Sequence, residues 1–109
     1  MSIAVVDAAG DLLAFARLDR AMPHSVTIAQ GKAATAARFK KPTGALETMV
    51  AQGRTAFVAV DGVTPLQGGV PIMVGAACVG AVGVSGVAAA DDEKCALAGV
   101  AALGLASAL

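Results

Sequence analysis

Two short apolar runs open the chain, residues 3–6 and 12–17. Between them lies a segment from Asp7 to Asp11 that is rich in residues tolerating turn conformations, Gly10 among them. Apolar runs of this length joined by such a turn are typical of paired strands. We therefore expect a β-hairpin at the start of the chain.

The middle of the chain carries helical patterns. Residues 25–40 are rich in alanine and free of proline until Pro42, and Ser25 is placed to cap the first turn. A shorter helix is expected over residues 43–51, followed by a short strand at 57–60 and a loop at 61–69. The segment at 25–40 is the clearest helix in the sequence.

Residues 70–90 form a run without a charge, long enough to suggest a membrane span. Pro71 opens the run and Gly75 divides it into two apolar segments, 70–74 and 77–85, which favours a buried hairpin and no membrane contact. A closing helix from 91 to about 108 then begins with the acidic residues Asp91, Asp92 and Glu93, which suit a helix N-terminus. Its apolar faces predict burial between the sheet and a neighbouring subunit.

Together these elements predict one domain, residues 1–109, of the α+β class. The order is ββα(α)βββα, with helices packed on an antiparallel five-stranded sheet rather than a parallel Rossmann sheet. A chain of 109 residues is the size of a single domain.

Composition narrows the range of partners. The chain is 57% hydrophobic and 15% charged, its eight basic residues balance eight acidic ones, and it has no Trp or Tyr. With neither a basic stripe nor stacking aromatics, nucleic acid is not expected as a partner. A small domain with so few charges cannot bury all of its apolar surface alone, which favours a homo-oligomer.

The N-terminus lacks a signal-peptide pattern, which predicts a cytoplasmic protein. The two cysteines, without metal-ligand spacing, are expected to be free, buried thiols, and no metal site is predicted.

Lys32 is the most informative polar residue. On a helical wheel it falls within the apolar face of the helix predicted over residues 25–40, close to Ser25 and Thr35. A buried ammonium needs a partner. One interpretation is a structural salt bridge to Asp19 or Glu93, and the other is a polar floor for an anionic ligand, formed with Ser25 and Thr35.

Two further residues lie near the start of the same helix. Arg17 ends the first hairpin, and its guanidinium suits a carboxylate or a haem propionate as well as an ordinary ion pair with Asp19. His24, the single histidine, is a candidate haem ligand or an ordinary solvated loop residue.

Glycines mark two other segments. Gly68 and Gly69 lead into a predicted strand, and the stretch containing Ser85 and Gly86 leads out of another. The second stretch has GxxGxxG spacing, which is not the dinucleotide fingerprint, and Ser85 is not in a nucleophile elbow. These glycines instead permit close packing, turns or the approach of a ligand to backbone N–H groups.

Several motifs occur in order along the chain and together resemble the GlcG/HbpS-like family, which includes the C-terminal domain of PduO-type proteins. They are Val5-Val6-Asp7-x-x-Gly10, Arg17-Leu18-Asp19, Ile28-Ala29-x-x-Lys32-Ala33-x-Thr35-Ala36, Gly68-Gly69-Val70-Pro71-Ile72, Val79-Gly80-x-Val82-Gly83-Val84-Ser85-Gly86 and Asp91-x-Glu93.

The resemblance implies a profilin-like fold of α/β/α layers, homo-oligomers from dimers to octamers and, in some members, haem binding or degradation. Its motif positions carry over as pocket candidates: Arg17, Ser25, Lys32, Thr35, Gly68, Gly69, Ser85, Gly86 and Glu93. Family members usually begin with a further helix, which is missing here. We expect either a misassigned start or a partner subunit covering the exposed apolar surface.

Three functions are compatible with these features. The first is a small-ligand-binding accessory protein of a catabolic pathway, holding haem or a small carboxylate. The second is a catabolic isomerase or lyase in which Lys32 acts as a base or Schiff-base amine. The third is a structural oligomeric module without a ligand. The sequence does not decide whether there is catalysis.

Overall fold

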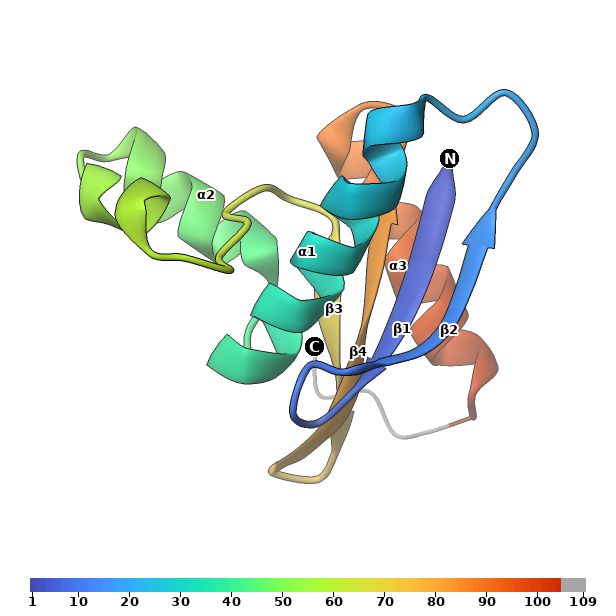
Figure 1. Cartoon of the computed structure of the whole chain (residues 1–109). Coiled ribbons are helices and arrows are strands. Elements are labelled where there is room, and N and C mark those ends of the chain that lie inside the picture. Colours follow the sequence, from blue (N-terminus) through green and yellow to red (C-terminus); the bar gives the residue numbers. More distant parts are fainter. Residues whose placement is uncertain (105–109) are drawn as a thin grey trace.

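The computed structural model describes residues 1–104 and contains a four-stranded antiparallel sheet in the order β2-β1-β4-β3 (Figure 1). The strands are β1 (Ser2–Asp7), β2 (Leu12–Arg17), β3 (Gly69–Val74) and β4 (Ala77–Ser85). The two predicted hairpins are confirmed, and β1 joins them by pairing with β4 in the register Ser2 to Ser85 and Asp7 to Gly80.

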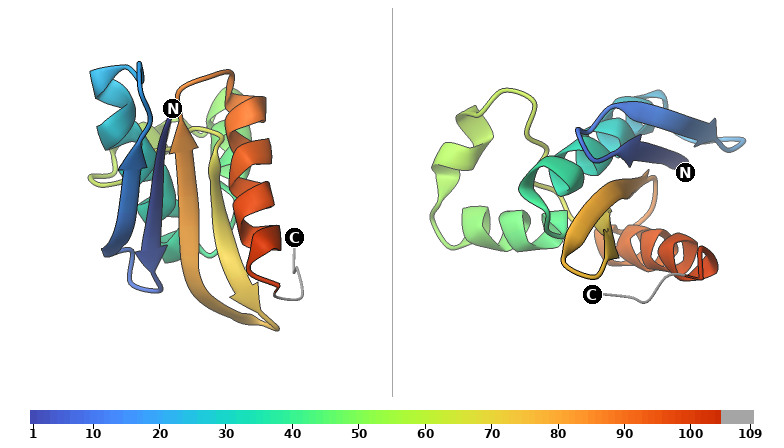
Figure 2. Two further views of the ribbon diagram at one scale, coloured as in Figure 1. Left: turned by 90° about the vertical axis from the view of Figure 1, so that its right-hand side faces the viewer. Right: turned by 90° about the horizontal axis from the view of Figure 1, so that it is seen from below.

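The helices are α1 (Pro23–Phe39), α2 (Thr43–Ala51) and α3 (Ala89–Ala102), with a short 3-10 helix η1 (Thr55–Ala59) after α2. Helix α1 packs on one face of the sheet over β1 and β4, and α3 lies against the other face over β3 and β4 (Figure 2). Helix α2 and η1 project to one side of these layers (Figure 1). The α+β class and the layered arrangement are therefore confirmed.

Small residues set the distance between α1 and the sheet. The cluster on this face contains Ala29, Ala33 and Ala36 from α1, packed against Ala4 and Val6. Gly83 completes the contact, because a Cβ at this position would overlap the Ala29 carbonyl oxygen. Close packing of this kind gains dispersion energy only when both surfaces are small and complementary.

The prediction of a fifth strand at 57–60 is wrong, because most of this segment forms η1 and the sheet has four strands. Three of the four residues are exposed and no neighbouring strand pairs with them. Phe57 instead stacks edge-on against Phe39 at 6.1 Å between ring centres, and the Arg54 guanidinium lies over its ring. An apolar run this short takes its conformation from such tertiary contacts.

Two helix boundaries also differ from expectation. Helix α1 starts at Pro23, so Ser25 lies inside the first turn and its hydroxyl donates to the Met22 carbonyl at 2.6 Å instead of capping the helix. Proline is favoured at this first position because it lacks an N–H that would otherwise need a partner. Helix α3 runs from Ala89 with Asp91 and Asp92 in its first turn, as the acidic start predicted. The predicted end at 108 lies outside the described residues.

The long uncharged run contains β3 and β4, and no helix within residues 1–104 is long and apolar enough to cross a membrane. Cys78 and Cys95 are free, as predicted, but they are half-buried and not buried as expected. Strands β2 and β3 form the two edges of the sheet, and β3 contains Pro71, which has no backbone N–H to offer along that edge.

Gly83→Ala tests the close contact between α1 and β4. The added methyl group must push the helix backbone outward, and we expect a loss of about 1–3 kcal/mol in the free energy of unfolding. Gly99→Ala is the matched control, because the place of its methyl group on α3 has no atom of another element within 4 Å, and alanine favours helix. Urea denaturation measures both, and equal stability of the two variants would contradict the packing argument.

Candidate functional site

Lys32 is buried in the interior, as predicted, with its side chain 4% exposed. Its Nζ donates to the Val84 carbonyl oxygen at 2.9 Å and forms an ion pair with Asp92 Oδ2 at 3.4 Å. The predicted partners Asp19 and Glu93 are both wrong. Successive residues on a helix point about 100° apart, so α3 turns Asp92 inward and leaves Glu93 at its side.

The ion pair joins three elements. Asp92 also accepts a hydrogen bond through Oδ1 from the Val87 backbone N–H at 3.1 Å, which fixes the connection between β4 and α3. Lys32 belongs to α1 and Val84 to β4. The two charged side chains thus hold α1 and α3 at the end of β4.

Gly68 and Gly69 pass close to Lys32, Gly68 beside its ammonium and Gly69 beside its backbone carbonyl. A Cβ on Gly68, which has a φ of +133°, would lie 2.7 Å from Lys32 Nζ, and a Cβ on Gly69 would overlap the Lys32 carbonyl oxygen. Thr43, at the start of α2, holds this loop by accepting from the Gly69 N–H at 2.8 Å and donating to the Leu66 carbonyl at 2.5 Å. Both glycines are therefore needed for the chain to pass so close to Lys32.

A pocket of about 270 Å³ opens nearby, between the start of α1 and the end of β4. It is lined by Met22, His24, Ser25, Ile28, Ser85, Gly86 and Val87. Ser25 forms one wall, and its hydroxyl hydrogen is donated to Met22, so the Ser2 hydroxyl must be the donor in the 2.9 Å bond between the two serines.

Ser85 differs from Ser25 in having no side-chain hydrogen-bond partner within the described chain, although it is 7% exposed. Within residues 1–104 no enclosed side-chain oxygen or nitrogen lacks a hydrogen-bond partner, so the Ser85 oxygen is open to the pocket and is available to a ligand or water. His24 and Met22 are exposed at the same pocket.

The structure separates the predicted site residues into groups. Ser25, Ser85 and Gly86 share the pocket with His24. Lys32, Gly68 and Gly69 instead form the ion-pair cluster and do not line this pocket. Arg17 donates from Nη2 to the Ala21 carbonyl at 2.9 Å, next to Met22 at the pocket rim.

Thr35 and Glu93 lie apart from the pocket. The Thr35 hydroxyl accepts from the Thr64 N–H at 2.9 Å and so holds the loop after η1 against α1. Glu93 is directed toward α2, because a Cβ on Gly44 would lie 3.1 Å from Glu93 Oε2.

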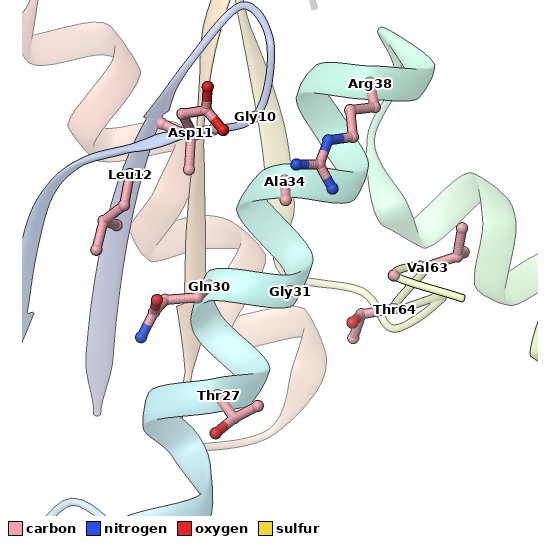
Figure 3. Close-up of a pocket in the computed structure, with 12 residues that line it drawn as sticks. Gly10, Asp11, Leu12, Thr27, Gln30, Gly31, Ala34, Arg38, Val63 and Thr64 are labelled. Atoms are coloured by element: carbon pink, nitrogen blue, oxygen red, sulfur yellow. The ribbon is translucent and has the colours of Figure 1, made fainter. Parts of the chain in front are cut away.

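Sequence reasoning missed Met22, Thr43 and Arg38. Met22 and Thr43 each adjoin a proline at a helix start, a signal that marks the boundary without revealing which hydroxyl or thioether faces inward. Arg38 contributes to a second cavity of about 480 Å³ on the outer side of α1 (Figure 3). Within residues 1–104, no three His, Cys, Asp or Glu side chains are grouped to hold a metal ion.

Residues 1–101 match the family described as haem degrading protein HbpS-like. Protein GlcG of Escherichia coli (strain K12) is 49% identical over 85 residues, which are 78% of this chain and 63% of that protein. The chain therefore belongs to the HbpS-like family, and it spans less than two thirds of the curated relatives it matches.

Solved structures share the fold. A double mutant of HbpS from Streptomyces reticuli superimposes with a TM-score of 0.87 at 39% identity, covering 94% of this chain and 70% of that one. The PduOC:Heme complex gives 0.88 at 27% identity, covering 96% and 79%. Protein ORFY of Klebsiella pneumoniae gives 0.88 at 26%, covering 97% and 76%.

Lys32→Met tests the ion pair. The substitution leaves the Asp92 carboxylate buried without its counter-charge, and we expect a loss of about 3–5 kcal/mol in the free energy of unfolding. The double variant Lys32→Met with Asp92→Asn should recover much of this loss, because the amide oxygen can still accept from Val87 and no charge is buried. Chemical denaturation of the unmodified protein, Lys32→Met, Asp92→Asn and the double variant measures the coupling, and additive losses would contradict it.

Proposed function

We propose that this protein binds haem as a small-ligand-binding accessory protein, with the pocket at the start of α1 as the contact site. The observation that carries the proposal is the co-location of His24, Met22 and the unpartnered Ser85 hydroxyl at one pocket. Membership of the HbpS-like family and the fold shared with a haem complex support the choice of ligand. A role beside catabolic enzymes in the cytoplasm is part of the proposal, and its catabolic part rests on resemblance alone.

The residues present fit the chemistry of haem. Imidazole and thioether are both axial ligands of haem iron in proteins, so His24 and Met22 each offer a suitable group. Ile28 and Val87 add apolar surface for the macrocycle. Haem would supply an iron centre and two carboxylates.

Arg17 would serve one of those carboxylates. Its guanidinium donates to Ala21 through Nη2 and keeps its other nitrogens for an anion. The pocket, at about 270 Å³, is slightly smaller than the usual range of ligand sites, so this chain would cover only part of the macrocycle.

The isomerase or lyase alternative needs an accessible Lys32. The ammonium is 4% exposed, is engaged with Val84 and Asp92, and lines neither the pocket at His24 nor the cavity at Arg38. A carbonyl substrate would have to displace the ion pair to reach it. The geometry therefore favours a structural role for Lys32 and a binding role for the neighbouring pocket.

Titration of hemin into the protein tests the proposal through the Soret absorbance band. We expect His24→Ala or Met22→Leu, whichever removes the iron ligand, to weaken binding about tenfold or more and to shift the band. Met49→Leu, on α2 and outside the pocket, is the matched control. Absence of a saturable band shift in the unmodified protein would reject haem binding by this chain.

We also propose that the chain forms homo-oligomers. Strand β2 exposes Leu12 at 49% and Leu13 at 67% on the edge of the sheet, and Ala14 and Ala16 beside them are exposed too. An apolar edge strand of this kind is a template for association.

Leu13→Lys should therefore shift the protein toward smaller species in light scattering coupled to size-exclusion chromatography. A charge at an apolar interface is costly to bury. Val58→Lys is the matched control, because Val58 is equally exposed at 66% but lies on η1. A uniform mass for all three proteins would argue against association through β2.

A further inference from the structure

A groove of about 480 Å³ runs along the outer side of α1, away from the pocket proposed for haem. Its floor is the helix at Gly31 and Ala34, and its walls are the β1–β2 turn on one side and residues 62–64 on the other (Figure 3). Gly31 lets the second wall approach, because a Cβ there would overlap Thr64 Oγ1. The volume is that of a small-molecule site.

Arg38 closes one end of the groove. Its Nε donates to the Ala9 carbonyl at 3.0 Å, which anchors the side chain to the β1–β2 turn. A Cβ on Gly10, in the β1–β2 turn, would lie 2.5 Å from Arg38 Nε, and a Cβ on Gly62, in the opposite wall, would lie 3.9 Å from Nη1. The guanidinium therefore reaches both walls. Its two terminal nitrogens make no hydrogen bond within the described residues and remain available as a paired donor for a carboxylate.

Asp11 supplies the opposite charge in the same groove. Figure 3 shows the Asp11 carboxylate and the Arg38 guanidinium in the upper part of the groove, with Ala34 on the helix below the guanidinium. Asp11 and Arg38 form no ion pair within 4.0 Å in the described part of the chain. Asp7 accepts the turn's backbone N–H groups, so the Asp11 carboxylate is not used to hold the turn.

We propose that this groove binds a small zwitterion that carries a carboxylate and an ammonium on the same carbon, the arrangement of a free α-amino acid. The ligand carboxylate would bind Arg38 in a bidentate manner, and the ammonium would bind Asp11. Two opposite charges that line one groove without pairing are complementary to a ligand with the reverse arrangement. Thr27 and Gln30, further along α1, would contact the ligand side chain.

The test compares three matched probes by NMR titration of ¹⁵N-labelled protein: L-alanine, L-lactate, which replaces the ammonium by a hydroxyl, and L-alaninamide, which removes the carboxylate. We expect L-alanine to shift the amide signals of Gly10, Gly31 and Ala34 in a saturable way, with both other probes at least about tenfold weaker. No saturable shift with L-alanine, or equal binding of L-lactate, overturns the proposal.

Two variants assign the charges. Arg38→Gln should abolish the L-alanine response, while Asp11→Asn should reduce L-alanine to the affinity of L-lactate. Arg54→Gln and Asp19→Asn change the same residue types outside the groove and should leave the response intact. Asp11→Asn keeps the test decisive if Arg38→Gln disturbs the turn, and a persistent preference for L-alanine in Asp11→Asn would refute the proposed ammonium contact.

Discussion

The fold depends on one buried charge that has to be satisfied. Lys32 enters the interior from α1, and its ammonium is held by the Val84 carbonyl and the Asp92 carboxylate. Removing each charge from water costs several kcal/mol, and the loss of one partner of a buried pair costs about 3–5 kcal/mol. The geometry around the two charges is therefore tightly constrained. That constraint explains why a glycine, Gly68, borders the Lys32 side chain, while Gly69 lies against the Lys32 backbone carbonyl. One interaction consequently positions α1, β4 and α3.

The family motif contains two kinds of residue that are mixed in the sequence and separated in space. Lys32, Gly68 and Gly69 hold the elements together, whereas Ser25 and Ser85 form walls of a pocket a short distance away. A motif that identifies the family therefore does not by itself identify the ligand site. Polar residues with all their hydrogen bonds made inside the protein have little left for a ligand, and the Ser85 hydroxyl stands out because it has none within residues 1–104.

Local patterns in the sequence were sufficient for the two hairpins, the three α-helices and the inward direction of Lys32. They failed at 57–60, where an apolar run packs through Phe57 against Phe39 as a 3-10 helix, and they failed to select Asp92 as the ion-pair partner. Both errors concern contacts between segments far apart in the chain. The groove beside α1 is a further case, because Asp11 and Arg38 are ordinary surface charges until the turn brings them to one side of the helix.

The two edges of the sheet are chemically unequal. Pro71 deprives the β3 side of a hydrogen-bond donor, while β2 has no proline and presents unpaired backbone groups along its outer side. Addition of a further strand is accordingly favoured at β2 over β3. If copies of the chain associate through the edges of their sheets, as proposed, a sheet that accepts a strand at β2 alone would join one other copy and then stop, which favours closed pairs over open-ended fibrils.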